Sequence, residues 1–303
     1  MTFKAEEAAT YDQAAERFAA LSDLYSGDLA ARLVDLAGIK AGDRVLDVGT
    51  GAGVVARAAA ERAGAAGRVM GIDISPKMVA HARERAAAQG LGGRLEYRVM
   101  DAENLDLDAA AFDVVVSLFA LLHLPTPLRA LTEMRRVLRP EGRLVVGVGS
   151  GAPLSARGIV HRLGRLRTLW SERRGQRLTA PRALESLLAL RMGPDAGASA
   201  HWEAHAREHH PEALHRLVVE AGFADVQCLW QGRDVSVSTP EEFWDLQATF
   251  SSPARRRLAD AAPAVVDGLR RELVERAQAV LARRGSLVYP QGVLFLCALR
   301  PAS

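Results

Sequence analysis

A chain of 303 residues, 49% of them hydrophobic, can bury a sizeable core, as one large domain or as one domain with an appended part. Its 39 basic residues nearly balance its 36 acidic ones, which excludes a strong whole-protein field that would favour a nucleic-acid partner. No apolar run approaches the ~20 residues that span a bilayer, and the N-terminus lacks the pattern of a signal peptide, so we expect a soluble cytoplasmic protein.

Residues 1–40 are predicted to form a helical cap before the first strand. Apolar residues recur at helical spacing in residues 6–37, and Ser26-Gly27 predicts a break between two helices. Tyr11 and Asp12 form an aromatic–acidic pair in the first of these helices. Tyr11 would either cover a bound ligand or only pack its helix against the sheet.

A strand-to-helix crossing follows the cap. Residues 44–48 form a short apolar run that predicts a buried parallel strand, and the residues from Val54 onward predict a helix. Gly49, Gly51 and Gly53 lie in the turn between them. Such a turn lets a ligand contact bare backbone, and the helix N-terminus offers N–H groups to an anionic group.

The next predicted strand, at residues 68–74, carries an acidic residue near its end. Asp73 comes 20 residues after Gly53, where nucleotide-binding folds place the acid that accepts hydrogen bonds from ribose hydroxyls. The dinucleotide rule G-x-G-x-x-G is not followed, because Val54 stands where its third glycine would be. The pattern therefore favours a nucleoside ligand and disfavours a nicotinamide cofactor.

The alternation of strands and helices continues to residue 150. Further strands are predicted at 95–100, 112–118 and 143–148, with helices at 77–90 and 127–138. This order predicts a parallel sheet with right-handed crossovers, in which ligands bind beyond the carboxyl ends of the strands. The polar residues at those ends are Asp47, Asp73, Asp101 and Ser117.

Residues 151–210 interrupt this alternation. The stretch is rich in arginine with interleaved leucine and tryptophan, which predicts either a basic amphipathic helix or a solvated face. His201, His205 and His209 recur at helical spacing, but no cysteine lies near them, and we expect no metal site.

Residues 211–303 are predicted to return to the sheet. A helix at 211–221 precedes a strand from Val226, and a last strand at 287–299 would pair antiparallel with it. The segment 239–285 between these strands is predicted to be helical, with Phe243, Trp244 and Phe250 on an apolar face. We expect this segment and residues 151–210 to form a lid over a pocket.

Four blocks of the chain resemble class I S-adenosylmethionine-dependent methyltransferases. Val45–Gly53 is similar to their first motif, Gly71–Met78 to the second cofactor block, Met100–Glu103 to the adenine block, and Phe112–Gly142 to the fourth strand and its helix. The last block is similar to the small-molecule branch that includes the ubiquinone and menaquinone C-methyltransferases. The resemblance implies a Rossmann-like, doubly wound α/β sheet of seven strands, mostly parallel with an antiparallel last strand.

The resemblance also implies where S-adenosylmethionine binds. The glycine turn would approach its methionyl part, Asp73 would bind the ribose, and Asp101 would bind the adenine. Carbonyl groups near Ser117 would meet the methionyl ammonium. The cofactor-binding residues that the resemblance implies are Tyr11, Asp47, Gly49, Thr50, Gly51, Gly53, Asp73, Ile74, Met78, Asp101, Ala102, Ser117 and Leu118.

The implied activity is methyl transfer to a carbon, oxygen or nitrogen of a small-molecule acceptor in biosynthesis, with S-adenosylhomocysteine as product. His123 follows the fourth predicted strand and would stand at the rim of the site. It would act either as a general base towards a hydroxyl or enol acceptor or only as part of the pocket wall.

Other functions remain open at this stage. The chain would alternatively bind the cofactor and catalyse a cyclisation or an isomerisation, and the motifs alone do not separate these from methyl transfer. An NAD-dependent oxidoreductase is opposed by Val54 and by the block around Asp101. The acceptor is left open, and a homodimer is compatible with the sequence.

Overall fold

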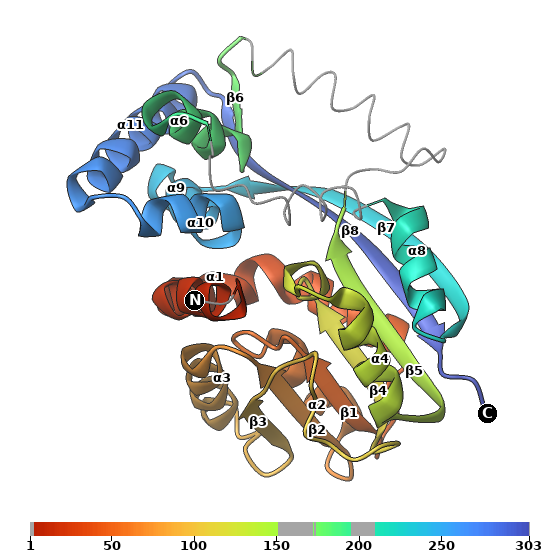
Figure 1. Cartoon of the computed structure of the whole chain (residues 1–303). Coiled ribbons are helices and arrows are strands. Elements are labelled where there is room, and N and C mark those ends of the chain that lie inside the picture. Colours follow the sequence, from red (N-terminus) through yellow and green to blue (C-terminus); the bar gives the residue numbers. More distant parts are fainter. Residues whose placement is uncertain (1–2, 151–171, 173, 195–209, 303) are drawn as a thin grey trace. The chain divides into compact units, whose positions relative to one another are not determined.

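The computed structural model describes residues 3–150, 172, 174–194 and 210–302, which divide between two compact units (Figure 1). The first unit contains residues 1–150, 207–231 and 293–303. The second contains residues 151–206 and 232–292. Each unit therefore draws on segments that are far apart in the sequence.

The first unit is built on a mostly parallel sheet, as predicted. Five parallel strands lie in the order β3-β2-β1-β4-β5, and β8 pairs antiparallel with β5 from Arg143↔Leu299 to Gly149↔Val293. The strands are β1 (Arg44–Val48), β2 (Arg68–Asp73), β3 (Leu95–Val99), β4 (Phe112–Leu118), β5 (Leu138–Gly149) and β8 (Ser286–Leu299). The doubly wound architecture with an antiparallel last strand is confirmed.

Both faces of this sheet are buried, which explains why its strands read as nearly continuous apolar runs. Val114 and Val116 of β4 pack in one core with α1, α2 and α3, whereas Val115 points to the other face and packs with α4 and α8. The helices are α1 (Phe3–Ala37), α2 (Val54–Ala63), α3 (Pro76–Ala88), α4 (Pro127–Val137) and α8 (Pro211–Glu220). The sheet thus fixes the strand ends between two layers of helices.

Helix α1 is one continuous helix of 35 residues, so the predicted break at Ser26-Gly27 is wrong. A glycine inside a helix costs about 1 kcal/mol relative to alanine. Leu29 and Leu33, one turn apart after this position, are fully buried in the core shared with α2 and α3. Tertiary packing therefore outweighs the local preference for a break.

The second unit is mainly helical in the part that the structure describes. The predicted cap of the 239–285 segment is present, because the Glu242 N–H donates to Thr239 Oγ1 at 3.1 Å at the start of α9. Helix α9 packs against α6, α10 and α11. The helices are α6 (Arg182–Met192), α9 (Pro240–Phe250), α10 (Ser252–Ala259) and α11 (Pro263–Ala282). None of the described helices is long and apolar enough to cross a bilayer.

The described strands form a sheet of eight strands rather than the predicted seven. The additional strand is β6 (Arg177–Thr179), which pairs parallel with the start of β8. Three residues are too few to show a strand period in the sequence. The remaining strand, β7 (Ala224–Val237), pairs with β8. The arginines at 157, 162, 165, 167 and 173 and the histidines at 201, 205 and 209 lie outside the described residues.

Candidate functional site

The carboxyl ends of four parallel strands bring the predicted polar residues to one edge of the sheet. The N–H groups of Gly49 and Thr50, after β1, both donate to the Ile72 carbonyl of β2 at 2.9 Å. The Met100 N–H donates to the Asp73 carbonyl at 3.0 Å, which joins the ends of β2 and β3. Ser117 of β4 donates its hydroxyl to the Val48 carbonyl at 2.8 Å. The predicted acids at these ends therefore belong to one site.

The glycine turn between β1 and α2 has three residues in the left-handed region, with φ of 71° at Gly49, 52° at Gly51 and 83° at Gly53. A Cβ at Gly49 would lie 2.2 Å from the Ala120 Cβ, and one at Gly53 would lie 2.3 Å from the Tyr97 hydroxyl. A Cβ at Gly51 would meet only the Phe18 ring, at 3.4 Å. Internal packing thus accounts for the outer two glycines, whereas at Gly51 the positive φ alone favours glycine.

Alanine at these glycines should separate backbone strain from packing. We expect Gly51→Ala to lower the free energy of unfolding by about 1 kcal/mol, the usual minimum for an L-residue in this region. Gly49→Ala should cost at least twice as much, because its methyl group would collide with Ala120. Urea unfolding of the two variants measures this order, and equal losses would show that Ala120 yields without cost.

Asp73 is the last residue of β2 and holds the turn in place. Its Oδ2 accepts the Gly51 N–H and its Oδ1 accepts the Ser75 N–H, both at 2.9 Å. Burial raises the pKa of this carboxyl group, and its backbone donors oppose that shift. Each carboxylate oxygen can accept a further hydrogen bond, so Asp73 fits a ligand that presents two hydroxyl groups.

Asp47 is fully buried at the end of β1. Its Oδ2 accepts a hydrogen bond of 2.6 Å from the Thr50 hydroxyl, while its Oδ1 makes no hydrogen bond to any described residue. Burial, with a smaller contribution from the charge of Asp73, raises its pKa to about 7, although Thr50 and the Ala56 N–H act in the opposite direction. A buried carboxylate oxygen without a donor is costly, and an ammonium group of a ligand would satisfy it.

This buried carboxyl group should make stability depend on pH. Between its ordinary pKa of 3.8 and its folded value of about 7, the folded protein holds a proton that the unfolded chain has lost. The free energy of unfolding should therefore fall as the pH rises through this window and level off above it. We expect the melting temperature of Asp47→Asn, relative to the wild type, to rise from pH 4 to pH 7. A constant difference would contradict this, and the exposed Asp108→Asn serves as control.

The first turns of α1 are bound to this edge by charged side chains. Lys4 Nζ lies 2.7 Å from both Asp101 Oδ2 and Glu103 Oε2, after β3. Asp12 Oδ1 accepts the Ser75 hydroxyl at 2.5 Å, at the N-terminus of α3. The predicted cap thus lies over the carboxyl edge. Asp12 was predicted there with Tyr11, whereas Lys4 gives no signal in the sequence.

An aromatic cluster stands beside these ion pairs. The Tyr11 ring is edge-on to both the His123 ring and the Phe18 ring, with centroid distances of 6.0 Å. His123 ends the short 3₁₀ helix η1 (Leu121–His123) after β4, and its Nδ1 lies 3.4 Å from Oε1 of Glu7 on α1. The structure therefore brings the predicted Tyr11 and His123 together, and it adds Glu7, which the sequence analysis missed.

The backbone after β4 is strained at Phe119, whose φ is 62°. A bulky residue is rare in this region, and such strain is often found at functional sites. The Phe119 N–H donates to the Gly147 carbonyl of β5 at 2.7 Å, and Ala120 then reaches Gly49. Strand β5 thus holds this strained turn against the glycine turn. No sequence signal identifies Phe119, because phenylalanine does not favour this conformation.

The other predicted residues lie at the same edge but differ in exposure. Met78 is buried in the first turn of α3, where its N–H donates to Ser75 Oγ at 3.1 Å. Ile74 is half-buried, whereas Ala102 and Leu118 are buried. Among the described residues, no group of three or more histidine, cysteine or acidic side chains is arranged for a metal ion.

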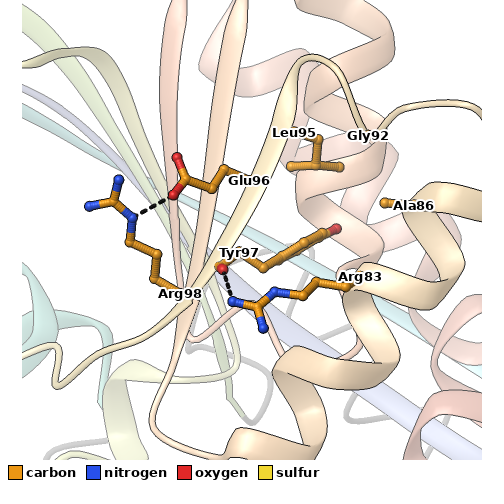
Figure 2. A pocket seen from close by; sticks show the side chains of 7 residues that line it. All are labelled: Arg83, Ala86, Gly92, Leu95, Glu96, Tyr97 and Arg98. Atoms are coloured by element: carbon orange, nitrogen blue, oxygen red, sulfur yellow. Dashed lines mark hydrogen bonds and ion pairs between the residues drawn. The ribbon is translucent and has the colours of Figure 1, made fainter.

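A separate hollow of about 310 Å³ lies beside the outer strand β3 (Figure 2). Both of its arginines already have partners, because Arg83 Nη2 donates to the Tyr97 carbonyl and Arg98 Nε donates to Glu96 Oε1, both at 2.6 Å. It is lined by Arg83, Ala86, Gly92, Leu95, Glu96, Tyr97 and Arg98. It contains none of the predicted site residues, so we assign the candidate site to the carboxyl edge.

The family described as a methyltransferase domain matches residues 46–146, which include the glycine turn, both acids beside it and His123. Residues 46–146 are a methyltransferase domain. The predicted family is thereby confirmed. Within this methyltransferase domain, Asp47 lies near the end of β1, Asp73 ends β2 and Asp101 follows β3.

Two curated relatives each match slightly less than half of the chain. Aklanonic acid methyltransferase DauC of Streptomyces sp. strain C5 is 34% identical over 143 residues, which are 47% of this chain and 64% of that protein. Demethylmenaquinone methyltransferase of Thermus thermophilus is 42% identical over 134 residues, which are 44% of this chain and 59% of that protein. The chain thus spans about three-fifths of the length of these relatives.

A solved structure extends the likeness of the fold beyond the methyltransferase domain. The 4+2 cyclase SpnF matches with a TM-score of 0.54 and 23% sequence identity over 92% of this chain and 82% of that chain. At this identity, the likeness shows a shared fold and says nothing about a shared reaction.

Proposed function

We propose that this protein is an S-adenosylmethionine-dependent methyltransferase that acts on a small molecule. The observation that carries this proposal is the pair of acids around the glycine turn of a methyltransferase domain. Asp73 holds the Gly51 N–H and keeps acceptor capacity for two hydroxyls, while Asp47 presents a buried oxygen without a donor. These two acceptors fit the ribose and the ammonium group of the cofactor.

Different residues at the carboxyl edge would bind different parts of the cofactor. Asp47 and the carbonyl groups near Ser117 would hold the methionyl ammonium, and Asp73 would hold the ribose. The Asp101 carboxylate already accepts hydrogen bonds from Lys4 and the Glu103 N–H. Its remaining lone pairs would accept one from the adenine amino group. The bound cofactor supplies an electrophilic methyl group on a sulfonium. Holding an acceptor in line with this group is worth up to ~10 kcal/mol in well-oriented systems.

His123 would act as the general base for an acceptor that must lose a proton. It lies at the edge, between η1 and α1, in contact with Tyr11. The names of the two relatives supply the first acceptors to test, aklanonic acid and demethylmenaquinone. Since the chain spans only part of those proteins, its own acceptor is a matter for experiment.

The test has two stages. Titration calorimetry with S-adenosylhomocysteine should show binding to one site, and absence of binding would overturn the proposal. Incubation with S-adenosylmethionine and each acceptor should then give a product heavier by one CH₂ unit, together with S-adenosylhomocysteine. A converted acceptor of unchanged mass would instead indicate the cyclisation or isomerisation that the sequence left open.

We further propose that the helices of the second unit form a lid that selects the acceptor. They interrupt the strand–helix alternation of the first unit, and α10 and α11 each pack on α9 and α6 as a separate helical group. Lids are drawn from the less stable parts of a structure and close on their ligands.

The lid proposal predicts a change in hydrogen exchange. Amide exchange in α6, α9, α10 and α11 should slow when both S-adenosylhomocysteine and an acceptor are bound, because closure protects these helices. Exchange in α8, which belongs to the first unit, serves as the reference and should not change. Unchanged exchange in all five helices would contradict a lid.

A further inference from the structure

Glu7 is a buried acidic side chain that faces the proposed base. Its side chain is only 7% exposed, and its Oε1 lies 3.4 Å from His123 Nδ1. Both of these atoms are inaccessible to solvent. A carboxylate in such a place is costly unless a positive charge or a hydrogen-bond donor faces it. We therefore expect His123 to present a hydrogen-bond donor or a positive charge to Glu7.

Helix α1 contacts the imidazole in two ways. Glu7 and Tyr11 are one helical turn apart, so both side chains lie on the same face of α1. Glu7 faces Nδ1, and the Tyr11 ring is nearly perpendicular to the imidazole, at an angle of 86°. With Nδ1 directed at Glu7, Nε2 is the ring nitrogen through which His123 would act as the proposed base.

The other charged groups near this pair already have partners of their own. Lys4, one turn before Glu7, binds Asp101 and Glu103. Glu103 also accepts the Thr126 N–H through its Oε1 at 2.7 Å. Lys4 and Glu103 are thus engaged with each other, whereas among the described residues the Glu7 carboxylate lies within 3.4 Å of the His123 ring.

The geometry points to Glu7 as the positioning residue of His123. In a neutral imidazole one nitrogen carries the proton and the other offers a lone pair. A lone pair on Nδ1 would meet the lone pairs of the carboxylate, whereas a proton on Nδ1 would be attracted to them. Glu7 therefore keeps the proton on Nδ1 and the lone pair on Nε2.

Only the use of this lone pair rests on the proposed function. Nε2 takes the proton of a hydroxyl or enol acceptor, the freed oxygen or carbon bonds to the methyl group, and the carbon–sulfur bond of the cofactor breaks to leave S-adenosylhomocysteine. The imidazolium that results has both nitrogens protonated, and its positive charge faces Glu7. The same carboxylate thus selects the tautomer before transfer and stabilises the cation after it.

The tautomer is directly measurable without an acceptor. Long-range ¹H–¹⁵N spectra of the histidine rings, with the His123 signals assigned by their loss in His123→Gln, report which nitrogen carries the proton. At a pH where the ring is neutral, the wild type should show a proton on Nδ1 as the major form. Glu7→Met keeps the length of the side chain and removes the acceptor, so the major form should change to a proton on Nε2. Glu16→Met, at an exposed position of the same helix, is the matched control and should leave the spectrum unchanged.

Each outcome decides the question. A wild-type ring protonated mainly on Nε2 overturns the inference, as does a Glu7→Met spectrum identical to that of the wild type. The wild-type spectrum alone is decisive if Glu7→Met does not fold. Calorimetry with S-adenosylhomocysteine on the same samples separates the two proposals, because absent binding rejects the proposed function whatever the tautomer is. Normal binding with the wrong tautomer rejects the role of Glu7 alone.

Discussion

Replacing Asp73 by alanine should weaken the binding of S-adenosylhomocysteine at least tenfold. The change removes the acceptor that we assign to two ribose hydroxyls, and hydrogen bonds to a charged group contribute about 1.5 to 3 kcal/mol each. It also removes the partner of the Gly51 N–H, which would leave the glycine turn less well held. Titration calorimetry measures the loss.

The matched control is Asp108→Ala, which deletes the same side chain at an exposed position after β3. It should bind S-adenosylhomocysteine as the wild type does. Thermal unfolding in the absence of ligand shows whether Asp73→Ala is folded at the temperature of the titration. A folded Asp73→Ala that binds within twofold of the wild type would mean that the ribose lies elsewhere.

Replacing His123 by glutamine should lower turnover about 100-fold once an acceptor is identified, the usual contribution of a general base. Glutamine approximates the size of the imidazole and keeps a hydrogen bond, but it does not take up a proton. Affinity for S-adenosylhomocysteine should stay unchanged, since no cofactor contact is assigned to the ring. Turnover is measured by mass spectrometry of the methylated product, with calorimetry alongside.

His215→Gln is the control for this variant, because His215 is exposed on α8. Its turnover should equal that of the wild type. If His123→Gln keeps near-normal turnover from pH 6 to pH 9, His123 is part of the pocket wall, as the sequence analysis left open. Reduced cofactor affinity in His123→Gln would also exclude a role confined to proton transfer.

The sequence predicted those parts of the site that depend on local pattern. The runs that became β1 and β2 are short and apolar, β1 is followed by a glycine and β2 ends in an acidic residue, and in a parallel sheet their ends must meet at one edge. Asp47 and Asp73 were therefore found without coordinates. The three glycines were found as well, although only the structure shows that internal packing accounts for Gly49 and Gly53 and not for Gly51.

The parts that were missed depend on contacts between distant segments. Glu7 meets His123, and Lys4 meets Asp101, because α1 lies across the strand ends, and no local period shows where a helix will dock. The break predicted at Ser26-Gly27 failed for the related reason that burial of the following leucines outweighs the preference of one glycine. Phe119 was missed because its strain is imposed by β5.

The pairing of β5 with β8 has a consequence for synthesis on the ribosome. The residues of β5 from Arg143 to Gly149 are synthesised early, but their antiparallel partner at residues 293–299 follows about 140 residues later. At the usual elongation rates of ~5–20 residues per second, the apolar edge of β5 waits roughly 7 to 30 s for this partner. An unpaired apolar strand edge is a template for association with other chains. A nascent chain of this protein should therefore depend on chaperones during that interval more than a protein whose neighbouring strands are made in succession.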